Sequence, residues 1–120
     1  MQVVAVSSEG PTLDDMVDPR FGRAGGFIIA DIDANTIKYI DNGASQMRAQ
    51  GAGIETAERI ADEGVKVVLT GYVGPKAFQA LQAAEVQVCQ NIEGITVGEA
   101  LEKYRSGQLC FAQSPNKQTV

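Results

Sequence analysis

The order of apolar and polar positions predicts five strands. Met1–Val6 is an apolar run that ends at a polar loop, which is typical of a strand covered on both faces. Residues 27–32 and 36–40 are rich in β-branched and aromatic side chains, and the Asp and Asn between them suit a tight turn, so these runs predict a hairpin. Residues 65–70 are apolar nearly throughout, which predicts a central strand, and residues 86–89 predict a short last strand.

Three further stretches predict helices. Apolar residues recur at helical spacing over residues 54–61, and Gly64 ends this helix. Pro75 is favoured in a first helical turn and begins the second helix. Thr96 and Glu99 form a capping box ahead of the third.

The resulting order of elements is β-β-β-α-β-α-β-α. It predicts an α/β fold whose mixed five-stranded sheet has the second strand antiparallel to the rest and is flanked by helices. In this topology the loops 8–26, 43–53, 71–76 and 89–95 converge at one edge of the sheet. Open α/β sheets usually bind their ligands at that edge, so we expect a site there.

Composition narrows the class of protein. The 120 residues, 44% of them hydrophobic, suit one domain, which we place at residues 1–109, and the polar, aperiodic residues 110–120 predict a flexible tail. No apolar run approaches the roughly 20 residues that span a bilayer, and the N-terminus opens on a strand, so we expect a cytoplasmic protein without a membrane partner. The net charge of −5 disfavours nucleic acid.

The predicted edge nevertheless gathers basic residues: Arg20, Arg23, Arg48 and Lys76. Helices begin near Gly51–Gly53 and Gly74–Lys76, where backbone N–H groups attract anions. Apolar rim surface is expected from Phe21, Met47, Tyr72 and Val73. This mixture suits a large, soft, multiply charged anion. The simpler alternative is that the glycines only make turns and the arginines are solvated.

Other chemistry has less support. Cys89 ends a strand and is either a soft metal ligand or a small buried hydrophobe, and Cys110 lies in the predicted tail. Asp31 and Asp33 could be a nuclease carboxylate pair, but they flank the hairpin turn, where Asp is expected. The chain has no His, no acid–base constellation and no phosphate-binding glycine motif, so we expect no catalysis.

Several spaced motifs resemble one known family. They are Asp18-Pro19-Arg20-Phe21-Gly22-Arg23-Ala24, Gly51-Ala52-Gly53, Gly64-Val65, Gly71-Tyr72-Val73-Gly74-Pro75-Lys76-Ala77 and Gly94-Ile95-Thr96-Val97-Gly98-Glu99-Ala100-Leu101. In this order they resemble the dinitrogenase iron-molybdenum cofactor biosynthesis family, from Val3 to about Leu109.

The resemblance implies a ribonuclease H-like motif fold without nuclease activity, and a role in binding, carrying or assembling a metal–sulfur cluster. The motifs are most similar to those of members that carry a molybdenum–copper sulfide cluster, with the iron-molybdenum cofactor or a precursor as the alternative cargo. Arg20 stands where some members have His. Arg cannot ligate a metal but donates several hydrogen bonds, which favours a cluster held without covalent bonds.

The expected cluster-binding residues are Arg20, Phe21, Gly22, Arg23, Met47, Arg48, Gly51, Gly53, Gly71, Tyr72, Val73, Gly74 and Lys76, with Cys89 as a weaker metal-ligand candidate. The alternative function is a regulatory or scaffold module that meets a protein partner through the same loops.

Overall fold

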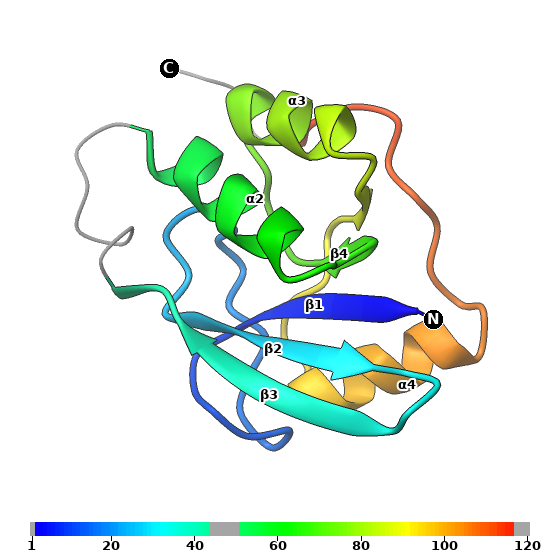
Figure 1. The fold of residues 1–120 in the computed structure, drawn as a ribbon. Coiled ribbons are helices and arrows are strands. Elements are labelled where there is room, and N and C mark those ends of the chain that lie inside the picture. The colour runs from blue at the N-terminus through cyan, green and yellow to red at the C-terminus, as the bar shows by residue number, and fades with distance from the viewer. Residues whose placement is uncertain (1, 44–50, 117–120) are drawn as a thin grey trace.

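The computed structural model describes residues 2–43 and 51–116, which form strands and helices in the predicted order (Figure 1). The strands are β1 (Val3–Ser8), β2 (Gly26–Asp31), β3 (Thr36–Asp41), β4 (Val67–Leu69) and β5 (Gln87–Cys89). The helices are α2 (Ala52–Asp62), α3 (Pro75–Ala83) and α4 (Val97–Arg105).

The sheet has the strand order β3-β2-β1-β4-β5. β2 pairs antiparallel with both β1 and β3, whereas β1, β4 and β5 are parallel. The mixed five-stranded sheet expected for a ribonuclease H-like motif is therefore confirmed. Ser8 lies opposite Gly26, and Gly26 lies opposite Asp41, so the loops that follow β1, β3, β4 and β5 share one edge with the loop that precedes β2. We call this edge the carboxyl edge.

The prediction that residues 65–70 form the central strand was wrong. β1 is the middle strand, and β4 lies between β1 and β5. Both β1 and β4 are interior strands that are covered on two faces, so an apolar run does not show which of them is in the middle.

Successive side chains of a strand point to opposite faces of the sheet, and each face packs against its own hydrophobic core. Ala5 packs in the cluster beneath α2 and α3, together with Ile60 and Leu81. Val4 packs in the opposite cluster with Leu101 of α4. Figure 1 shows α2 and α3 on one side of the sheet and α4 on the other.

The helices differ in how they begin. α4 has the predicted capping box, in which the Thr96 hydroxyl accepts a hydrogen bond from Glu99 N at 3.1 Å and the Glu99 carboxylate accepts one from Thr96 N at 2.9 Å. The hydrogen bonds that the Glu99 carboxylate accepts from Thr96 N and from the Thr96 hydroxyl lower its pKa. α2 and α3 instead begin after Gly51 and Gly74, neither of which supplies a side-chain cap. Their first-turn N–H groups therefore have no side-chain oxygen from the N-cap residue.

Residues 110–116, which we call the C-terminal segment, lie along β5 at the edge of the sheet. Ala112 N donates to Val88 O at 2.7 Å, and Gln90 Nε2 donates to Ser114 O at 2.7 Å. The domain boundary at Leu109 stays a prediction, and residues 117–120 of the expected tail lie outside the described residues. Among the residues that the structure describes, no helix is long and apolar enough to span a bilayer.

Candidate anion-binding site

Residues 18–25 form a loop at the carboxyl edge, which we call the arginine loop. Asp18 is only 2% exposed, and its carboxylate organises this loop. One oxygen accepts hydrogen bonds from Arg20 N at 3.0 Å and Arg20 Nε at 3.1 Å. The other accepts from Arg20 Nη2 and Gly25 N, both at 3.1 Å. A single buried carboxylate thus fixes both the loop backbone and the direction of the arginine.

The Arg20 side chain remains 52% exposed although Asp18 holds one side of its guanidinium. Hydrogen bonding to Asp18 raises the Arg20 pKa further above its ordinary value, so the group is always charged. Asp18 accepts hydrogen bonds from the Nε and Nη2 donors, and a guanidinium carries further N–H groups that could donate to an anion. The pair is a bidentate, charge-assisted contact, which orients the guanidinium as well as neutralising the carboxylate.

The arginine loop also pairs with the loop between β4 and α3. Tyr72 N donates to Pro19 O at 2.7 Å, and Phe21 N donates to Tyr72 O at 3.2 Å. Gly71 has to be small, because a Cβ there would lie 2.5 Å from Pro19 O. These contacts place Arg20 beside the chain that leads into α3.

Buried polar side chains join the same loop to α2. Asn42 is fully buried and donates from Nδ2 to Gly22 O at 3.2 Å and Ala24 O at 3.1 Å. The Thr56 hydroxyl also donates to Gly22 O at 3.1 Å, and Arg59 Nη1 donates to Asn42 Oδ1 at 3.0 Å. The loop backbone is therefore ordered before any ligand arrives.

Three glycines at this edge stand where neighbouring segments pack too closely for a side chain, whereas a fourth, Gly74, has no such close neighbour among the described residues. A Cβ on Gly22 would lie 2.8 Å from Gly53 N, and one on Gly53 would lie 2.9 Å from the Cβ of Ala77. Gly71 packs on Pro19 as described above. Gly74 has an ordinary φ of −76° and no atom within 4 Å of a built Cβ in the described part of the chain. The start of α3 therefore has open space beside it.

The described segments predicted for the site do come together. The arginine loop, the start of α2 and the residues that lead into α3 contact one another, and they contain Arg20, Gly22, Arg23, Gly51, Gly53, Gly71, Tyr72, Gly74 and Lys76. Lys76 is exposed in the first turn of α3. Met47 and Arg48 lie outside the described residues.

The expectation that Phe21 and Val73 supply apolar rim surface was wrong. Phe21 is 1% exposed and packs edge-on against Phe27, with ring centroids 5.4 Å apart. Val73 is fully buried in the same core cluster. Burying these side chains anchors the two loops to the sheet. Their backbones, not their side chains, remain at the carboxyl edge.

Acidic groups moderate the charge of this edge. Tyr72 is 40% exposed, and a hydrogen bond to Glu93 raises its pKa. The Glu9 carboxylate is close enough to contribute to the raised pKa of Arg20. Among the described residues, Glu93 and Glu9 therefore partly offset the positive charge that Arg20, Arg23 and Lys76 bring to this edge.

Cys89 is 1% exposed and packs in the core beneath α4. Burial raises the pKa of its thiol to about 11, and nearby Cys110 adds to the shift. A buried, protonated thiol is a poor metal ligand at neutral pH. In residues 2–43 and 51–116 no cluster of three or more His, Cys, Asp or Glu side chains could hold a metal ion.

Alkylation distinguishes the two thiols. With iodoacetamide at pH 8, we expect the exposed Cys110 to react readily and Cys89 to react at least about a hundredfold more slowly, because a pKa raised by two units lowers the thiolate fraction by that factor. Mass spectrometry of the digested protein measures both rates. Equal rates in the folded protein would contradict the assigned environment of Cys89.

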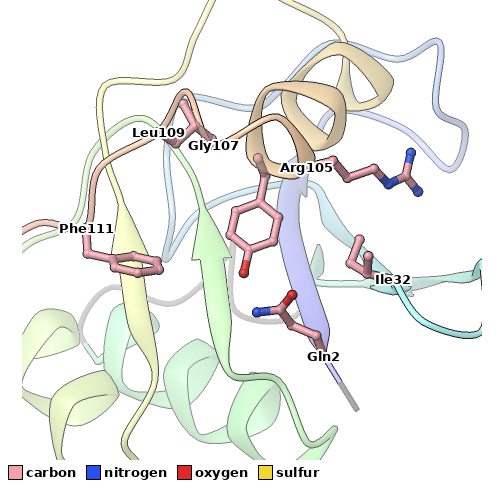
Figure 2. Close-up of a pocket in the computed structure, with 7 residues that line it drawn as sticks. Gln2, Ile32, Arg105, Gly107, Leu109 and Phe111 are labelled. Atoms are coloured by element: carbon pink, nitrogen blue, oxygen red, sulfur yellow. The ribbon is translucent and has the colours of Figure 1, made fainter.

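A separate pocket lies at the opposite, amino edge of the sheet (Figure 2). It measures about 370 Å³, and its lining includes Gln2, Ile32, Tyr104, Arg105, Leu109 and Phe111. Figure 2 shows Gln2 at the start of β1 and Arg105 at the end of α4, so this pocket shares no residue with the arginine loop. It offers positions for control substitutions.

Sequence reasoning missed the residues that hold the site in place. Asp18 stands in a recognised motif, and its spacing of two residues from Arg20 could have suggested a local hydrogen bond. Asn42 and Thr56 meet the arginine loop from distant parts of the chain. No local pattern signals those long-range contacts.

Comparisons with known proteins assign the chain to a family. Residues 1–107 match the family model described as "Dinitrogenase iron-molybdenum cofactor". The chain belongs to this family. Its similarity to the apo form of the orange protein from Desulfovibrio gigas extends over 98% of both chains, with 55% identity and a TM-score of 0.95.

Two further proteins are similar, one in structure and one in sequence. An NMR structure of a Thermotoga protein placed in the DUF35 family is 36% identical, covers 91% of both chains and has a TM-score of 0.80. An uncharacterized protein of Methanocaldococcus jannaschii is 28% identical over 102 residues, which are 82% of this chain and 85% of that protein. Membership of the dinitrogenase iron-molybdenum cofactor family confirms the resemblance seen in the sequence motifs.

Proposed function

We propose that this family member binds and carries an anionic metal–sulfide cluster at the carboxyl edge, without covalent attachment and without turning over a substrate. The cargo that we favour is a molybdenum–copper sulfide cluster, with the iron-molybdenum cofactor or a precursor as the alternative. The observation that carries the proposal is the Arg20 guanidinium, fixed by Asp18 and half exposed, on a loop that pairs with Tyr72 just before α3, whose N-cap Gly74 supplies no side-chain cap.

The donor set suits such an anion. Terminal and bridging sulfides are large, soft acceptors that take hydrogen bonds from several directions. Arg20 offers a charged planar donor, Lys76 offers an ammonium, and the α3 N-terminus favours negative charge by about 0.3 to 1 kcal/mol. The open space beside Gly74 admits a bulky group close to those N–H groups.

The family and the orange protein similarity support a cluster as the cargo, and the chemistry of the edge supports an ionic, hydrogen-bonded mode of holding it. In this mode of binding, the buried Cys89 does not ligate the cluster. The roles given to the individual residues of the edge belong to the proposal. The two helix starts and the arginine loop act together, because each contact alone is modest.

A titration tests the proposal. Adding tetrathiomolybdate and Cu(I) to the purified protein should give a visible absorption band that saturates at a defined stoichiometry. A variant with Cys89→Ala and Cys110→Ser should bind equally well, because the thiols are not ligands. Absence of saturable binding would reject cluster carriage and favour the protein-partner alternative.

A further inference from the structure

The C-terminal segment ends against the same loop that leads into α3. Figure 1 shows it, in orange to red, running from α4 past the sheet to the start of α3. The contacts of Ala112 and Ser114 with β5 carry the chain in that direction. Its last described residue, Asn116, contacts Gly71 and Val73 in the loop between β4 and α3, which lie more than 40 residues earlier in the sequence.

Asn116 uses its whole side-chain amide on the loop and its neighbour. Nδ2 donates to Gly71 O at 2.7 Å and to Asn91 Oδ1 at 3.0 Å. Oδ1 accepts from Val73 N at 2.9 Å. The backbone N–H of Asn116 donates to Gln90 Oε1 at 2.8 Å, which fixes the residue itself.

These bonds complete the support of the loop between β4 and α3. The backbone N–H and C=O of Tyr72 face the arginine loop, through Pro19 O and Phe21 N. The flanking Gly71 O and Val73 N face Asn116. The loop is held on two sides, and Gly74, the N-cap residue of α3, follows it directly.

We propose that Asn116 is a positioning residue of the cluster site, which sets the backbone of Gly71–Gly74 and so the direction of the α3 N-terminus toward the bound anion. This inference rests on the proposed function and assigns the C-terminal segment a part in it. Removing the side-chain amide of Asn116 leaves Val73 N–H without its acceptor. The loop backbone is then less restrained and samples more than one conformation.

Amide hydrogen exchange tests the local claim in the apo protein. In Asn116→Ala, exchange at Val73 N–H should accelerate at least about tenfold, which corresponds to the loss of one hydrogen bond, while exchange at Leu69 N–H in β4 stays unchanged. Gln90→Ala removes the anchor of Asn116 and should produce a smaller acceleration at the same amide. The control is Gln108→Ala, whose amide contacts only the nearby Ser106 hydroxyl among the described residues.

Affinity tests the functional claim with copper and tetrathiomolybdate as the probe. Asn116→Ala should bind about tenfold more weakly, at unchanged stoichiometry, and should still unfold cooperatively with a melting temperature several degrees below that of Gln108→Ala. Unchanged Val73 exchange would overturn the inference whether or not the probe binds. Faster exchange with wild-type affinity would also overturn it, whereas a wild-type protein that does not bind the probe would reject the proposed function and not the loop contact.

Discussion

Replacing Arg20 and Arg23 together by glutamine should lower the affinity for the copper–thiomolybdate cluster by about a hundredfold, because each lost charge-assisted contact is worth about tenfold or more. The direction of the Arg20 guanidinium is fixed, since Asp18 holds it through two hydrogen bonds. The melting temperature should fall, because buried Asp18 loses its charged partner, but the fold should persist, because Asp18 keeps its bonds from Arg20 N and Gly25 N and the arginine loop keeps its bonds to Tyr72 and Asn42. Titration monitored by visible absorption measures the change.

The matched control replaces Lys103 and Arg105 by glutamine. Both lie in the last turn of α4, so the change in net charge is identical but falls away from the carboxyl edge. The wild-type affinity should also weaken with salt, since exposed charges are screened over about 10 Å at 0.1 M ionic strength. Equal losses in the two double variants, or no loss in either, would place the site elsewhere.

Gly22→Ala should lower the free energy of unfolding by about 2 to 3 kcal/mol, because overpacking against backbone has no cheap relief. The added Cβ would lie 2.8 Å from both N and Cα of Gly53, at the start of α2. The melting temperature should fall by several degrees or more, on the order of 4 °C for each kcal/mol in a domain of this size. Calorimetry or chemical denaturation measures it.

Gly74→Ala is the contrasting variant. Its φ of −76° suits any residue, and the new Cβ meets nothing within 4 Å among the described atoms, so the stability should change by less than about 1 kcal/mol. The methyl group occupies space beside the α3 N-terminus, so affinity for the cluster should nevertheless fall. If Gly74→Ala destabilised the apo protein as strongly as Gly22→Ala, the space beside α3 would not be open.

The sheet could be predicted because its signals are local. Apolar runs, turn residues and the Thr96 capping box each lie within a few neighbouring residues, and the convergence of the loops follows from the strand order. The bounds were less accurate, since β4 covers only Val67–Leu69 of the predicted 65–70. An apolar run shows that residues are buried but not which of them enter the ladder of hydrogen bonds.

The interior of the site could not be predicted in the same way. Phe21 and Val73 lie in loops, and the sequence does not show whether an apolar loop residue turns toward the rim or the core. The contacts of Asn42 with Gly22, and of Asn116 with Gly71, join positions far apart in the chain. Such contacts depend on the completed fold, so no spacing of residues reveals them.

Backbone amide NMR of the protein with and without one equivalent of the copper–thiomolybdate cluster tests the central claim most directly. The chemical-shift changes should concentrate at residues 20–23, at the start of α2 and at Gly74–Ala77, with little change at Tyr104 and Phe111 around the pocket at the amino edge. Shift changes centred on that pocket, or on Cys89 and the core beneath α4, would contradict a cluster held by the arginine loop and the α3 N-terminus.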